Sequence, residues 1–196
     1  MGYGRKAAGN RKLAAGRFDP ATVLYFRAMH PRRPLSLCLL CLLLLKAHIT
    51  LAGDETGQPA PRFRARTTAG TQFNNESIKG KVVLFEFWTT WCQYCEKEAS
   101  LVDDLAKEFS DRGLIVLAVD VLEPDQKVKK YLVEHPRSVP IVLTKDTNLA
   151  AMYNAQVYPI YVVIDREGNI AAEQRGASGE RALRKMLKRA GIQSEE

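Results

Sequence analysis

The amino-acid sequence predicts an α/β fold with a mixed central sheet flanked by helices. Two observations support this prediction. Short apolar runs that suit buried strands alternate with segments of helical periodicity through the second half of the chain, which is typical of βαβ units with a parallel core. The last two strand-like runs are separated only by the turn Asp165–Gly168, which adds an antiparallel edge to that core.

The strands are predicted from runs of apolar and β-branched residues. Residues 82–88 (VVLFEFW) are almost continuously apolar or aromatic, as expected of a strand covered on both faces. A weaker extended region precedes them, through Thr71. The later strands are expected at 114–121, 139–144, 159–165 and 169–174.

The helices are predicted from apolar spacing and from residues that start or stop helices. Between 95 and 109 apolar side chains recur at helical spacing with charged residues opposite, and Gly113 ends that helix. Pro124 opens a helix to about His135, because proline is favoured in a first turn. A short helix is expected at 146–153, and Ser178 is expected to cap a final helix that ends near Ala190.

The N-terminal part of the chain has the layout of a secretory leader. Basic residues precede the apolar run 35–45, which is shorter than the roughly 20 residues that span a bilayer. Thr50 and Ala52 are small residues at suitable cleavage positions, so residues 1–52 are interpreted as a signal peptide with its true start at Met29. The alternatives are a plain N-terminal tail before Met29 and an uncleaved membrane anchor. A linker is expected at 53–60.

The positive charge of the chain is confined to that leader. Nine lysines and arginines and one aspartate lie up to Ala52, a net charge of +8, whereas the whole chain carries +7, so the remainder carries −1. No basic face is left to bind nucleic acid. The only expected contact with a membrane is through the leader.

Four cysteines form two CxxC pairs, and the leader holds the first. Cys38 and Cys41 lie within the apolar run, far from the second pair, Cys92 and Cys95. The rest of the chain then offers two cysteines and His135, too few ligands for a four-coordinate zinc site without carboxylates. We expect no metal and no cofactor.

Cys92 and Cys95 stand where a buried strand gives way to a helix. A cysteine at a helix N-terminus lies near unpaired backbone N–H groups and the positive end of the helix dipole, which favour its thiolate. A disulfide between residues three apart closes so small a loop that it contributes little structural stabilisation. The pattern therefore favours a redox-active Cys92–Cys95 pair over a metal clip or a structural cross-link.

With that pair in place, the sequence resembles the thioredoxin-like superfamily, and in particular its TlpA/ResA-type extracytoplasmic thiol–disulfide oxidoreductases. The resemblance is carried by FEFWTTWCQYC, by LIVLAVDV and by YNAQVYPIYVVIDREGNI. It implies a thioredoxin fold over residues 61–190, with an N-terminal extended region, an inserted helix and strand at 124–144, and a tail at 191–196. Gln93 and Tyr94 between the cysteines depart from the usual pattern, in which a proline precedes the second cysteine.

Several residues acquire expected roles. The resemblance places Pro159 at a cis-proline that faces the cysteines, with Pro140 as a weaker rival, and gives substrate contacts to Tyr158 and Trp91. Glu86 interrupts the apolar strand on the face of Leu84 and Trp88, where burial raises the pKa of a carboxyl group. We expect Glu86 to exchange a proton with Cys95, the alternative being a carboxylate that reaches solvent at a strand edge.

The predicted function is dithiol–disulfide exchange with protein substrates outside the cytoplasm. The resemblance implies a reductant, with cytochrome c maturation as a candidate pathway and a membrane-embedded thiol protein as its electron source. Two alternatives stay open. One is a copper-binding chaperone module similar to Sco proteins, and the other is a disulfide oxidase or isomerase.

Overall fold

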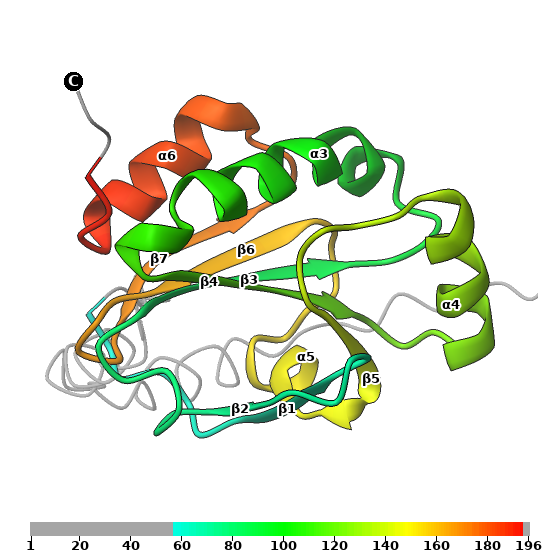
Figure 1. Ribbon diagram of the computed structural model, residues 1–196, viewed down its shortest axis with the longest axis horizontal. Helices are drawn as coiled ribbons and strands as arrows, with labels where there is room; N and C mark the ends of the chain where they lie inside the picture. Colours follow the sequence, from blue (N-terminus) through cyan, green and yellow to red (C-terminus); the bar gives the residue numbers. More distant parts are fainter. Residues whose placement is uncertain (1–56, 194–196) are drawn as a thin grey trace, which may run out of the picture. The chain divides into compact units, whose positions relative to one another are not determined.

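The computed structural model describes residues 57–193, which form a seven-stranded mixed sheet with helices on both faces (Figure 1). The strand order is β2-β1-β5-β4-β3-β6-β7. The sheet is built from β1 (Arg64–Thr67), β2 (Gln72–Asn74), β3 (Val82–Trp88), β4 (Leu114–Asp120), β5 (Ile141–Thr147), β6 (Ile160–Ile164) and β7 (Ile170–Arg175). β3, β4 and β5 run parallel, whereas β6 and β7 pair antiparallel as expected of the closing hairpin.

β3 is an interior strand of the sheet, between β4 and β6, and all seven of its residues are buried. Successive side chains of a strand point to opposite faces, so β3 contributes to two cores. Phe85 and Phe87 pack on one side, and Leu84 and Trp88 on the other. Glu86 points to the same side as Leu84 and Trp88.

The helices cover the two faces unequally. α3 (Gln93–Glu108) and α6 (Gly179–Arg189) lie together on one face, and α5 (Leu149–Met152) lies on the other (Figure 1). α4 (Asp125–Glu134) follows β4 and contributes Val128 to the core on the α3 side. Gly113 ends the turn after α3 with a φ of 81°, a conformation in which only glycine avoids strain.

The segment after α4 departs from the prediction. β5 continues to Thr147, beyond the expected end at residue 144, because Ala65 of β1 pairs with Thr147. The short helix expected at 146–153 is therefore only one turn long. β1 and β2 form an antiparallel hairpin on this edge; β1 lies in the region where the sequence indicated weak extended structure, whereas β2 follows the expected end of that region at Thr71.

Both ends of the described chain are more firmly attached than expected. In the stretch expected to be a linker, Gly57 and Ala60 donate backbone hydrogen bonds to the carbonyl groups of Ile170 and Gly168. At the other end, Ile192 is buried in the core on the α3 side. The leader 1–52, its start at Met29, and Cys38 and Cys41 lie outside the described residues. Within 57–193, no helix has the length and apolar character needed to cross a membrane.

Candidate active site

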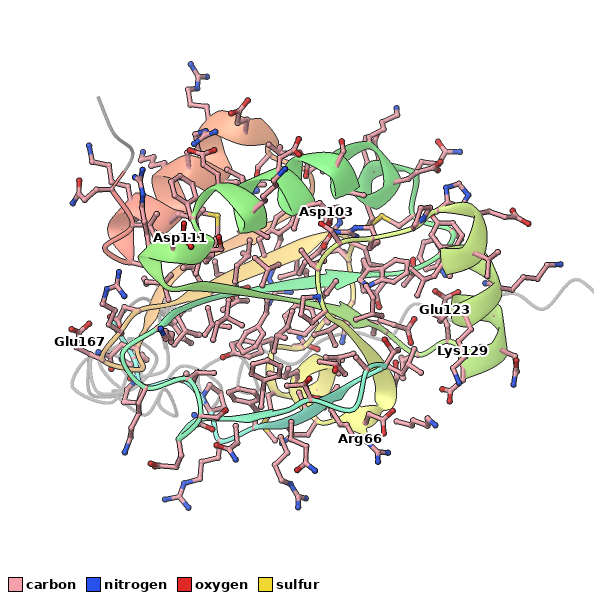
Figure 2. The ribbon with its side chains drawn as sticks, viewed as in Figure 1. Arg66, Asp103, Asp111, Glu123, Lys129 and Glu167 are labelled. Carbon is pink, nitrogen blue, oxygen red and sulfur yellow. A yellow bond between two sulfur atoms is a disulfide. The ribbon has the colours of Figure 1, made fainter. Side chains whose placement is uncertain are left out.

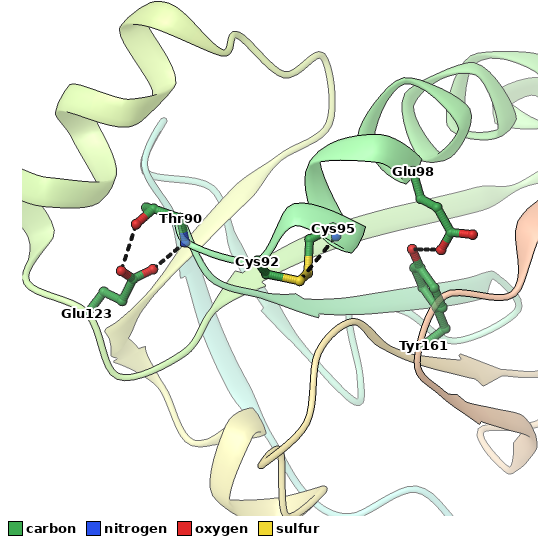
Figure 3. Close-up of a disulfide and its surroundings, with 6 residues drawn as sticks. All are labelled: Thr90, Cys92, Cys95, Glu98, Glu123 and Tyr161. Atoms are coloured by element: carbon green, nitrogen blue, oxygen red, sulfur yellow. Dashed lines mark hydrogen bonds between the residues drawn. A yellow bond between two sulfur atoms is a disulfide. The ribbon is translucent and has the colours of Figure 1, made fainter.

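Cys92 is the N-cap residue of α3, as predicted. Its φ and ψ angles of −84° and 98° are those of extended backbone, and its Sγ accepts a hydrogen bond of 3.1 Å from the Cys95 backbone N–H (Figure 3). Cys95 lies one helical turn further on, and the two residues form a disulfide with their Cα atoms 5.3 Å apart. The helix thus offers its free amide groups to Cys92, the environment that favours a thiolate once the disulfide is reduced.

A carboxylate that the sequence analysis missed holds the loop before Cys92. Glu123 accepts hydrogen bonds from both the backbone N–H and the side-chain hydroxyl of Thr90, the latter at 2.8 Å (Figure 3). Lys127 Nζ lies 2.6 Å from a carboxylate oxygen of Glu123. Burial would raise the pKa of Glu123, but the hydrogen bonds from Lys127 and Thr90 outweigh it and the pKa is lowered. An ionised Glu123 therefore fixes the redox loop to the start of α4.

The loop that carries Pro159 contacts the redox loop through aromatic rings. The Tyr158–Pro159 peptide bond is cis, as the resemblance implied; Pro140 is not preceded by a cis bond. The Trp91 and Tyr158 rings meet edge to face with their centroids 5.6 Å apart, and the Tyr158 hydroxyl donates to the Ala155 carbonyl. Trp91 is 63% exposed, so an apolar side chain next to Cys92 in the chain lies open at the surface.

Glu86 is completely buried, which excludes the alternative of a solvent-exposed carboxylate at a strand edge. Its Oε2 lies 2.8 Å from Arg137 Nη2, whereas its Oε1 has no hydrogen-bond partner among the described residues. Burial raises the pKa of Glu86, and the charge and hydrogen bond of Arg137 only partly oppose that effect. Arg137 was not recognised in the sequence because it lies on the loop between α4 and β5, far from Glu86 along the chain.

A second buried carboxylate, Glu98 of α3, ties this helix to β6 and α6. It accepts a hydrogen bond of 2.8 Å from the Tyr161 hydroxyl (Figure 3) and further bonds from the backbone N–H groups of Ser178 and Gly179. The predicted capping role of the Ser178 side chain is wrong. Ser178 occupies the N-cap position, but its hydroxyl makes no hydrogen bond with the described residues, and Glu98 satisfies the helix start instead.

His135 has a packing role at the end of α4. Its ring stacks on Tyr131 at a centroid distance of 4.2 Å, and its Nδ1 lies 3.7 Å from a carboxylate oxygen of Glu96. Among residues 57–193, no group of three or more histidines, cysteines or carboxylates is arranged to hold a metal ion.

A cleft opens beside the buried cysteine. It has a volume of about 320 Å³, and Cys95, Trp88 and His135 line it together with Asp103 and Arg137. Both cysteines are buried, Cys95 at 3% exposure and Cys92 at 7%, and Cys95 lines the same cleft as the arginine that binds Glu86.

The fold and the redox pair define a thioredoxin-like protein, and comparisons with known proteins agree. Residues 56–173 match the AhpC/TSA family. The chain is 29% identical to the thiol-disulfide oxidoreductase ResA of Bacillus thuringiensis over 135 residues, and this match covers 69% of this chain and 78% of that protein. It is 30% identical over 132 residues to ResA of Bacillus subtilis, covering 66% and 74%.

A solved structure has the same fold. The putative thiol:disulfide interchange protein DsbE from Chlorobium tepidum superimposes with a TM-score of 0.64 at 21% identity, over 70% of this chain and 99% of that one. The chain belongs to the AhpC/TSA family, among its ResA-type thioredoxin-like thiol–disulfide oxidoreductases.

Proposed function

We propose that this protein reduces disulfides in protein substrates outside the cytoplasm, with Cys92 as the nucleophile and Cys95 as the resolving cysteine. The observation that carries the proposal is the position of Cys92 at the N-cap of α3, with its sulfur bonded to the Cys95 amide and joined to the Cys95 sulfur. A sulfur in that position is stabilised as a thiolate, which is the species that attacks disulfides.

In the first step the reduced enzyme attacks. The Cys92 thiolate forms a bond to one sulfur of the target disulfide, the target S–S bond breaks, and the released target thiolate takes a proton from water. Trp91, which is exposed, and the backbone of Tyr158 and Pro159 would hold the target chain beside Cys92.

In the second step Cys95 resolves the mixed disulfide. Cys95 loses its proton to Glu86, directly or through a bridging water, and attacks the sulfur of Cys92. The Cys92–target bond breaks and the second target thiolate is protonated. The target gains two electrons, and the enzyme is left with the Cys92–Cys95 disulfide. The burial of Glu86 on the same side of the sheet as α3, with its raised pKa, supports this role.

The direction of electron flow and the location are part of the same proposal. Proteins named ResA support a reductant, and the leader-like residues 1–52 support export. A reductant outside the cytoplasm has no NADPH-linked supply, so a thiol protein in the membrane would restore the dithiol. The cysteines at which haem is attached to apocytochrome c are a candidate substrate.

Cysteine variants of the full-length protein test the proposal. Cys95→Ser should accumulate a mixed disulfide with insulin that non-reducing electrophoresis detects, because the nucleophile attacks and nothing resolves it. Cys92→Ser should form no such complex and should not reduce insulin. Undiminished insulin reduction by Cys92→Ser would refute the assignment.

Two alternatives have their own tests. A titration of the disulfide would separate a reductant, expected near about −270 mV, from a strong oxidase near about −120 mV. A copper titration of the reduced protein tests the Sco-like chaperone. Stoichiometric binding that depends on His135 would favour that alternative.

A further inference from the structure

A buried ion-pair network links the strand under the active site to the redox helix. Arg137 Nη2 lies 2.8 Å from Glu86 of β3, and Arg137 Nε lies 2.8 Å from Asp103 of α3. The Arg137 side chain is only 7% exposed. Asp103, which Figure 2 shows on α3, also accepts a hydrogen bond from the Ser138 backbone N–H. One guanidinium is therefore held in a single orientation between two carboxylates.

This network contains more negative than positive charge. Two carboxylates share one guanidinium, and Glu86 Oε1 has no partner among the described residues. Burial raises the pKa of Glu86, Arg137 opposes the shift, and the charges of Asp103 and Glu98 add to it. The proton affinity of Glu86 thus depends on how strongly Arg137 binds it rather than Asp103.

Other charged and titratable groups also lie near Glu86 and Cys95. Glu98 of α3 is engaged by the Tyr161 hydroxyl and by the start of α6, and Tyr161 is the cross-strand neighbour of Glu86. The other titratable residues around the cleft beside Cys95 are Glu96, Asp104, Tyr131 and His135. Both Arg137 and Asp103 line that cleft, so the ion pair and the resolving cysteine border the same cleft.

We propose that Arg137 is a positioning residue for the resolving step: it orients the Glu86 carboxylate, and its division between Glu86 and Asp103 sets how readily Glu86 accepts the proton of Cys95. This inference rests on the proposed function of Glu86 and adds the residues that tune it. Without the Arg137 charge, Glu86 keeps its own proton to higher pH and cannot act as a base near neutrality. Without the Asp103 charge, Arg137 interacts with Glu86 alone, and Glu86 ionises at lower pH.

The two steps can be measured separately in one reaction. The reduced full-length protein attacks 5,5′-dithiobis(2-nitrobenzoate) through Cys92 and releases one equivalent of the coloured thiolate. Cys95 then displaces the second equivalent as the intramolecular disulfide forms. Stopped-flow absorbance gives both rates as a function of pH. The first rate reports Cys92, and the second reports deprotonation and attack by Cys95.

Arg137→Gln and Asp103→Asn should shift the pH midpoint of the second rate in opposite directions. Arg137→Gln is expected to shift its pH midpoint upward by about one unit or more, a loss of about tenfold below the midpoint, with the first rate unchanged. Asp103→Asn is expected to shift the midpoint downward, and Arg137→Lys to restore most of the wild-type profile. Arg184→Gln, which breaks an exposed pair with Glu108 on the same face of the sheet, is the control and should leave both rates unchanged.

The outcomes distinguish a failure of the inference about Arg137 from a failure of the proposed roles of Cys95 and Glu86. Shifts of Arg137→Gln and Asp103→Asn in the same direction, equal effects on both rates, or wild-type profiles in both variants would overturn the inference. If Arg137→Gln fails to fold, a downward shift in Asp103→Asn together with a near-wild-type profile in Arg137→Lys still decides it. A wild-type protein that releases only one equivalent would instead refute Cys95 as the resolving cysteine. An unchanged second rate in Glu86→Gln would refute the proton role of Glu86.

Discussion

Replacement of Glu98 by alanine should destabilise the protein far more than removal of an exposed ion pair on the same helix. The Glu98 carboxylate accepts three hydrogen bonds, from the Tyr161 hydroxyl at 2.8 Å and from the backbone N–H groups of Ser178 at 3.0 Å and Gly179 at 2.6 Å. Tyr161 is completely buried, so its hydroxyl would have no solvent to turn to. The change would therefore detach α3 from β6 and from the start of α6 at once.

The expected loss in the free energy of unfolding is about 3–5 kcal/mol. A hydrogen bond to a charged acceptor contributes about 1.5–3 kcal/mol, and a buried donor left without a partner costs about 1–3 kcal/mol. The three bonds share one acceptor and do not add fully, and the two amides can regain water near the helix start. Glu98→Gln keeps an acceptor oxygen and should lose only about 1–2 kcal/mol.

Urea denaturation of the oxidised full-length protein measures this loss. With a slope of about 2 kcal/mol per molar urea, Glu98→Ala should lower the midpoint by about 2 M. Glu108→Ala on the same helix removes only an exposed ion pair with Arg184 and should lose less than about 1 kcal/mol. A loss for Glu98→Ala no larger than that of Glu108→Ala would show that the three bonds do not stabilise the fold.

Two further predictions concern the edge of the active site. Burial raises the pKa of Asp120 to about 6, which hydrogen bonds from Thr144 only partly oppose, so the folded state holds this proton more tightly than the unfolded chain does. That stabilisation is complete below about pH 4 and is lost as the pH rises to about 6. The free energy of unfolding of the wild-type protein, measured by urea titration, should therefore fall by about 2–3 kcal/mol more over this pH range than that of Asp120→Asn. Parallel pH curves for the two proteins would contradict this prediction. Trp91→Ala should slow exchange with insulin while leaving 5,5′-dithiobis(2-nitrobenzoate) reduction and the melting temperature nearly unchanged, because a protein chain is large enough to pack on the exposed ring whereas the small disulfide is not. Equal losses with both substrates would exclude a docking role.

The pattern of nearby residues predicted the elements that carry the redox pair. The run 82–88 became the central strand, and Cys92 became the helix cap, because both depend on local preferences: an unbroken apolar run suits a buried strand, and a helix start needs an N-cap residue. The prediction was poorer where an edge pairing decides the structure. β5 extends to Thr147 only because β1 lies beside it, and the short α5 begins late for the same reason.

The partners that control the site lie far apart in the sequence. Thr90 and Glu123 are 33 residues apart, Glu86 and Arg137 are 51 apart, and Glu98 and Tyr161 are 63 apart. Each pair joins a residue of β3, α3 or the loop between them to one that reaches it only when the sheet and its helices assemble. In the sequence, Glu98, Glu123 and Arg137 resemble ordinary surface charges, so no periodicity or spacing marks these pairs in advance.

The linear order of residues was enough to place two cysteines at the junction of a strand and a helix, since that junction is made from consecutive residues. It also marked Glu86 as an acid in an apolar strand. Tertiary packing alone decided what surrounds that acid. It placed Arg137 rather than water against Glu86 and brought Trp91 against Tyr158. It also made Glu98, rather than the Ser178 side chain, the acceptor for the backbone N–H groups at the start of α6. The physical reason is that a buried charge requires a partner, and the assembled sheet and helices determine which segment supplies it.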